Sequence, residues 1–163
     1  MNSILLVLTT FFTGLMTGLF YSWSISVMPG LAKLGDENYL SAFQSMNRAI
    51  INPVFLIVFM GLVVLLILLS YLSYNSSTPM QFWFILSAAA FYIAGVMLVT
   101  FLGNIPLNNS LEALQIETMN AEQMASFRLG FESKWNTLNL IRTICSSFSF
   151  LSLVIACLHN SSK

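Results

Sequence analysis

Residues 53–74 read PVFLIVFMGLVVLLILLSYLSY, a run of 22 residues without a charged side chain. Crossing the hydrocarbon core of a bilayer takes about 20 helical residues, so this run is long enough to span it. Pro53 stands in what would be the first helical turn, where its missing N–H costs no hydrogen bond. The run therefore predicts a membrane-spanning helix.

Three further apolar stretches have similar lengths, at residues 4–28, 81–102 and 138–158. The first lacks the basic start and the A-x-A-like site of a signal peptide, so we interpret it as a retained helix. The sequence predicts an all-α membrane protein, a four-transmembrane-helix bundle in which residues 1–163 form a single domain.

The composition agrees with this class of protein. Hydrophobic residues make up 57% of the chain and charged residues 7%, whereas soluble domains carry about 25% charged residues. The lipid bilayer is the expected partner, and the formal net charge of zero gives no electrostatic reason to bind nucleic acid. A single histidine and two cysteines twelve residues apart, Cys145 and Cys157, predict neither a metal site nor another cofactor.

The two longer connections, residues 29–52 and 103–137, each follow an odd-numbered span, so they are expected at the same end of the bundle. Each contains an amphipathic helical pattern that we expect to continue into the following span. Pro106 biases Ile105 away from the helical conformation, so the third span should fray there. Basic residues favour this end, with only Lys163 at the other, and the positive-inside rule then puts the long connections in the cytoplasm.

The first span carries small residues every fourth position: Thr10, Gly14, Gly18, Ser22, Ser26 and Gly30. Small residues let helix backbones approach closely. We expect this stripe to pack inside the bundle, and a dimer face is the alternative.

Polar residues gather where the spans meet the long connections. Gln44, Arg48 and Asn52 stand at i, i+4 and i+8, with Asn47 beside them, ahead of the second span. Arginine in or near lipid requires partners, because its desolvation must be offset. We expect carbonyls, carboxylates or an anionic ligand to supply them.

Further polar residues follow the third span directly, at Asn104 and Asn108, and lead into the fourth, at Trp135, Asn136, Asn139 and Arg142. Asparagines at a helix end are often caps, Trp135 could anchor at the interface, and Arg142 could be a structural arginine that reaches towards the headgroups. The functional alternative is one polar cluster at one end of the bundle. In it, Arg48, Arg142 and Asn139 would be catalytic and the other seven polar residues would bind substrate.

The sequence motifs around these residues resemble the anthrone oxygenase-like family of small four-helix membrane proteins. The resemblance rests on VMPGL at 27–31, FQSMNRAIINP at 43–53, TFLGNIPLN at 100–108 and WNTLNLIRT at 135–143. It implies a metal-free and flavin-free oxygenase acting on anthrones or similar aromatics in a membrane, for bacterial members the inner (plasma) membrane. Many members carry a histidine where this chain has Asn139, and an amide cannot take a proton at neutral pH.

Three hypotheses therefore stand. The first is a cofactor-independent oxidoreductase that acts on a hydrophobic aromatic, anthrone-like or quinol-like, entering from the bilayer. The second is a non-catalytic membrane protein whose polar cluster holds a quinone, a lipid or a partner helix. The third, a transporter, is disfavoured because no ionisable residue lies in the middle of a span.

Overall fold

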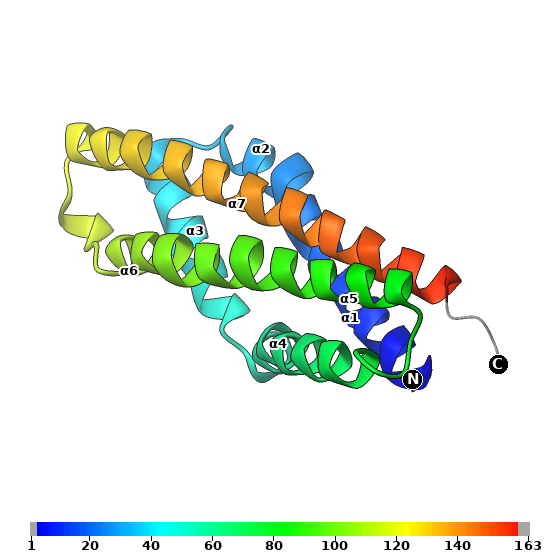
Figure 1. Cartoon of the computed structure of the whole chain (residues 1–163). Coiled ribbons are helices and arrows are strands. Elements are labelled where there is room, and N and C mark those ends of the chain that lie inside the picture. The colour runs from blue at the N-terminus through cyan, green and yellow to red at the C-terminus, as the bar shows by residue number, and fades with distance from the viewer. Residues whose placement is uncertain (1–2, 160–163) are drawn as a thin grey trace.

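The computed structural model describes residues 3–159, whose regular elements are all helices joined by short turns and loops, with no strand among them (Figure 1). Four continuous helical stretches are long and apolar enough to cross a membrane: Ser3–Leu31, Pro53–Ser73, Pro79–Glu112 and Ala121–Leu158. This confirms the predicted all-α fold with four spans.

Two of the four stretches contain π-helical turns, and the elements follow one another in a simple order. The first stretch comprises α1 (Ser3–Ser22), η1 (Trp23–Val27) and α2 (Met28–Leu31). Then come the separate helices α3 (Asp36–Ile50) and α4 (Pro53–Ser73). The third stretch comprises α5 (Pro79–Tyr92), η2 (Ile93–Leu98), η3 (Thr100–Asn104) and α6 (Ile105–Glu112), and a short turn, η4 (Ile116–Thr118), precedes α7 (Ala121–Leu158).

The long connections lie together at one end of the bundle. Figure 1 shows α3, α6 and the start of α7 at that end, while the start of α1, the α4–α5 turn and the end of α7 lie at the other. Helix α7 packs along α1 and α5, and α4 packs against the same two helices. Lys163, which entered the orientation argument, lies outside the described residues.

Three helix boundaries bear on the predictions: two differ from what the sequence predicted, and one is confirmed. Helix α3 does not continue into the second span, because the Asn52 side chain accepts a hydrogen bond from the Phe55 N–H and starts α4 anew. The prediction for α7 is confirmed, since it runs unbroken from an Asn120 capping box into the fourth span. The third stretch continues past Pro106 instead of fraying. The π turn at Thr100–Asn104 explains this, because its wider spacing relieves the clash between a proline ring and the preceding turn.

The buried apolar residues form two clusters. One lies among the spanning helices and includes Phe20, Phe59, Leu66 and Tyr92. The other lies at the end with the long connections, where Phe43 of α3 packs edge-on against Trp135 of α7, with ring centroids 5.0 Å apart. The second cluster makes the amphipathic segments an integral part of the fold.

Arg128 fastens the start of α7 to the segment before α3. Its guanidinium donates to Asp36 and Glu132, at 2.9 and 2.8 Å, and to the backbone carbonyls of Leu34 and Ala32. It also lies 4.2 Å from the centroid of the Tyr39 ring, a cation–π contact. These contacts hold α3 and α7 in a fixed relative position, and the candidate site depends on both.

The stripe of small residues on the first span does not face the bundle along its whole length. Thr10 contacts Cys157 and Gly14 contacts Phe150, both on α7, but Gly18, Ser22, Ser26 and Gly30 are exposed. Four residues advance a helix about 40° beyond a full turn, so a four-residue stripe rotates steadily out of any one interface. The predicted packing face is therefore wrong beyond Gly14. The buried face of α1 is instead Leu6, Thr9, Thr13, Met16 and Phe20.

Candidate functional site

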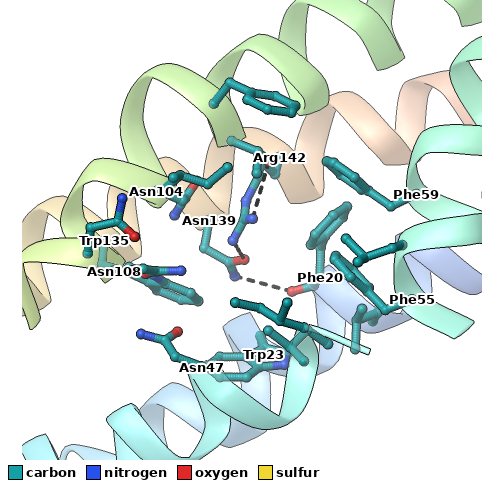
Figure 2. A pocket seen from close by; sticks show the side chains of 18 of the residues that line it. Phe20, Trp23, Asn47, Phe55, Phe59, Asn104, Asn108, Trp135, Asn139 and Arg142 are labelled. Atoms are coloured by element: carbon teal, nitrogen blue, oxygen red, sulfur yellow. Dashed lines mark hydrogen bonds between the residues drawn. The ribbon is translucent and has the colours of Figure 1, made fainter. Parts of the chain in front are cut away.

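A cavity of about 580 Å³ lies between the two apolar clusters, at the end of the bundle that carries the long connections (Figure 2). Its volume falls in the range of small-molecule sites. Every spanning stretch and α3 contribute to its wall. Two of the three π-helical segments do so as well, η1 through Trp23 and η3 through Thr100 and Asn104. Such turns recur at functional sites.

Arg142 is the charged residue inside this cavity. It is 8% exposed, and its guanidinium carbon lies 4.7 Å from the centroid of the Phe20 ring and 5.4 Å from that of Trp135. Within residues 3–159 no carboxylate lies within ion-pair distance of Arg142, and its Nε has no hydrogen-bond partner. A buried charge without a counter-charge is costly. The side chain does not reach the surface, so the structural alternative of a headgroup-seeking arginine does not describe it.

Asn139 lies one turn before Arg142 and orients it. The Oδ1 of Asn139 accepts a hydrogen bond from Arg142 Nη2 at 2.8 Å. The Nδ2 of Asn139 donates to the Phe20 carbonyl at 3.2 Å and to Ser24 Oγ at 2.8 Å. Both ends of the amide are therefore occupied, and Asn139 ties the guanidinium to the first span.

Asn104 faces the same cavity with an unpaired amide. Its side chain is 1% exposed, and neither Oδ1 nor Nδ2 has a hydrogen-bond partner in the described chain. Buried amides are almost always hydrogen-bonded, because leaving one unpaired costs about 1–3 kcal/mol per group. Asn104 does not cap a helix end, since the third stretch continues past it.

Trp135, Asn108 and Asn47 complete the polar wall towards the α3 end. Trp135 is buried and donates from Nε1 to Asn108 Oδ1 at 2.9 Å, so it is not an interfacial anchor. Asn47 is 7% exposed, and its Nδ2 has no partner among the described residues. Figure 2 shows Asn47, Asn104, Asn108 and Arg142 arranged around one space from different elements.

Arg48 and Glu112 line the cavity at its rim. Arg48 Nε and Glu112 Oε1 are 2.6 Å apart, joining α3 to α6, and their side chains are 65% and 43% exposed. Arg48 is therefore paired, whereas Arg142 is not. Of the partners expected for an arginine near lipid, a carboxylate is the one found for Arg48.

Three residues of the predicted site lie outside the cavity lining. Gln44 donates to the carbonyls of Leu111 and Leu114, which fastens α3 to the end of α6. Asn52 caps α4, and Asn136, the position after Trp135 on α7, is absent from the lining. Helix geometry explains why Asn52 and Asn136 do not line the cavity. Asn52 follows a break that resets the helical phase, and adjacent helical residues such as 135 and 136 point about 100° apart.

Several cavity residues were not anticipated from the sequence. Phe20 and Trp23 come from the first span, Phe55 and Phe59 from α4, and Thr100 from η3. Thr100 Oγ1 accepts from Arg142 Nη1 at 3.4 Å. The aromatic residues carry no local signal, because in an apolar span a phenylalanine facing a cavity is indistinguishable from one facing lipid.

The cavity wall includes exposed residues of the candidate spans. Leu56 and Met60 of α4 and Phe101 of η3 line it and are 42%, 44% and 46% exposed. Among the described residues no group of three His, Cys, Asp or Glu side chains gathers closely enough to hold a metal ion.

This chain matches a model of a protein family. The model described as anthrone oxygenase matches residues 54–152, more than half of the chain. No curated protein and no solved structure matches it. The matched region contains Asn104, Asn108, Trp135, Asn139 and Arg142. Phe20, Trp23, Asn47 and Arg48 lie before it.

Proposed function

This chain belongs to the anthrone oxygenase family, and we propose that it oxidises a hydrophobic aromatic ketone or quinol with dioxygen in the cavity beneath Arg142. The single observation that carries the proposal is the buried guanidinium of Arg142, which lies in a mostly apolar cavity and has no carboxylate of the described residues as a counter-charge. A positive charge in surroundings of low dielectric stabilises a developing oxyanion far more than it would in water. Such a group is costly for the fold, so a role in binding or chemistry accounts for it.

The proposed reaction begins with a ketone that carries a CH₂ group between two aromatic rings. That carbon loses one proton to a water molecule, which gives an enolate whose negative oxygen lies against Arg142 and Asn104. The enolate carbon transfers electrons to dioxygen and forms a C–O bond, and the peroxide anion takes one proton back from water. The resulting hydroperoxide then loses water as its O–O bond and the remaining C–H bond break. One dioxygen is consumed, and one quinone carbonyl and one water are formed, so atoms and electrons balance.

Access from the bilayer supports an apolar substrate. Leu56, Met60 and Phe101 line the cavity and are exposed on helices that are long and apolar enough to span a membrane, so on this proposal a flat aromatic molecule dissolved in the membrane enters between α4 and η3. On this proposal the protein works in a plasma membrane, for a bacterial member the inner membrane, with the bilayer as substrate reservoir.

The test is dioxygen consumption and quinone absorbance with anthrone as substrate, on protein reconstituted in lipid nanodiscs. Arg142→Met should lower turnover about 10²–10³-fold, the usual loss when one oxyanion-stabilising group is removed. Lys134→Gln is the matched control, because it removes an exposed positive charge from the same helix eight residues earlier. Turnover no greater than in empty nanodiscs would exclude oxidation of this substrate.

One observation favours a second candidate, a non-catalytic holder of a quinone. Among the cavity-lining residues the sole carboxylate is Glu112, which is already paired with Arg48, so the cavity offers no free side-chain base. Trp23 and Trp135 both line the cavity, and quenching of their fluorescence by a ubiquinone analogue would report binding. Saturable quenching without dioxygen consumption would favour this candidate.

A further inference from the structure

We infer that the cavity binds its aromatic ligand as an oxyanion with a hydroxyl group next to the charged oxygen, and that Arg142, without a protein base, brings about this ionisation. The inference deepens the proposed function and rests on it for the choice of an aromatic ligand. It concerns binding and does not require turnover.

The charge balance of the cavity supports an anion. The titratable side chains that line it are Arg142 from α7, Arg48 from α3 and Glu112 from α6; the lining residues of α1, η1, α4 and η3 include none. Arg48 and Glu112 neutralise each other at 2.6 Å. One positive charge therefore remains inside, and an anionic ligand removes the cost of burying it.

The unpaired amide of Asn104 adds a second requirement. Its Nδ2 needs an acceptor and its Oδ1 needs a donor, and neither atom has a partner in the described residues. Exchanging the two amide atoms leaves the same need for one acceptor and one donor. A ligand with an oxyanion and a hydroxyl on neighbouring ring positions supplies an acceptor for one amide atom of Asn104 and a donor for the other. A lone oxyanion would leave the amide oxygen unpaired, at a cost of about 1–3 kcal/mol.

Because no free side-chain base lines the cavity among the described residues, the anion has to form without one. A phenol that enters neutral must lose its proton, and the cavity contains no free side chain that would accept it. Arg142 instead stabilises the ionised form, because an opposite charge at close range favours ionisation. The phenol O–H bond breaks and the proton passes to bulk water past the exposed Arg48–Glu112 pair. Binding of a neutral phenol therefore releases one proton to solution.

Alizarin, a 1,2-dihydroxyanthraquinone, is the probe for this inference. It carries two neighbouring hydroxyls, changes colour on ionisation, and is already a quinone, so the proposed oxidation cannot consume it. In nanodiscs containing the protein, the pH midpoint of the colour change should fall by at least one unit relative to empty nanodiscs. Binding at a pH between the bound and free midpoints should also release a proton in weakly buffered solution, approaching one per ligand as the shift grows.

Variants separate the two parts of the inference. Arg142→Gln should abolish the midpoint shift, whereas the control Lys134→Gln should keep it. Asn104→Leu should reduce the shift without abolishing it, and it should lose the preference for alizarin over 2-hydroxyanthraquinone, which lacks the neighbouring hydroxyl. If Arg142→Gln does not fold, proton release by the wild-type protein still decides the question, since it needs no variant.

The outcomes distinguish this inference from the proposed function. Alizarin that binds without a midpoint shift, a shift that survives Arg142→Gln, or no alizarin binding at any pH would each overturn the inference. Dioxygen consumption with anthrone would leave the proposed function standing in all three cases. A midpoint shift without anthrone oxidation would support anion binding and count against the oxygenase.

Discussion

Arg142 donates a hydrogen bond from Nη2 to Asn139 Oδ1, 2.8 Å away and one turn earlier on α7. Asn139 in turn donates to the Phe20 carbonyl and to Ser24 Oγ on the first span. The guanidinium is thus held in position by an amide that also joins two spanning helices. Side chains that are locked by such hydrogen bonds keep a site preorganised.

Replacing Asn139 by leucine should weaken both the fold and the site. The change removes the acceptor of Arg142 Nη2 and the donor to Phe20 and Ser24, which should destabilise the protein by about 1–3 kcal/mol. Ligand affinity should fall as well, because Arg142 loses its fixed orientation. Thermal unfolding in detergent and alizarin binding at a temperature where the variant stays folded would measure the two effects. Thr137→Ala, an exposed position on the same helix, should change neither, and equal losses in both variants would contradict the assignment.

Gly95 should be sensitive to the smallest possible side chain. A Cβ added there would lie 2.3 Å from Cβ and Sγ of Cys145 on α7, too close for any contact. Gly95→Ala should therefore destabilise the bundle by about 1–3 kcal/mol through overpacking. Gly61→Ala is the matched control, because nothing lies within 4 Å of its added Cβ, and it should be neutral or stabilising. Thermal unfolding of the two single variants decides the comparison, and equal midpoints would refute the close approach of η2 and α7.

Gly14 and Gly18 should behave differently although they form one G-x-x-x-G motif. A Cβ at Gly14 would lie 2.9 Å from Phe150 Cε2, whereas the space around Gly18 is open. Gly14→Leu should lower the unfolding temperature, and Gly18→Leu should leave it unchanged. Light scattering of the detergent-solubilised variants would show whether Gly18 serves a dimer face instead. A large loss of stability in monomeric Gly18→Leu would restore the packing stripe predicted from the sequence.

The Arg48–Glu112 pair should contribute little to stability. Both side chains are substantially exposed, at 65% and 43%, and exposed ion pairs are worth at most about 1 kcal/mol. Arg48→Met should therefore shift the unfolding temperature only slightly. A double-mutant cycle with Glu112→Gln, run at low and high salt, should give a coupling energy that shrinks as salt screens it. A coupling of several kcal/mol would show that the rim is far less hydrated than its exposure indicates.

The depth of the polar residues in the bundle could be predicted from the sequence, but their roles could not. The second and fourth spans start at the end where the third finishes, so Arg48, Asn104 and Arg142 had to lie at a similar level. Which arginine would be paired depended on the rotation of each helix and on a partner, Glu112, 64 residues away from Arg48. The sequence treats the two arginines alike, whereas the fold exposes one and buries the other.

The sequence by itself determined that this protein has four helices able to span a membrane, with its long connections at one end. The reason is that the length and hydropathy of a span are local properties of the chain, and they suffice for a helix to cross a bilayer. Only the tertiary structure decided which side chains face the cavity. A helical phase break at Asn52, the π turn that ends at Asn104 and the rotation of the first span decide the lining. Phe20 and Trp23 belong to it, and Gln44, Asn52 and Asn136 do not. Each residue added or removed from a helical turn rotates everything after it by about 100°, and that rotation is fixed by packing between distant segments.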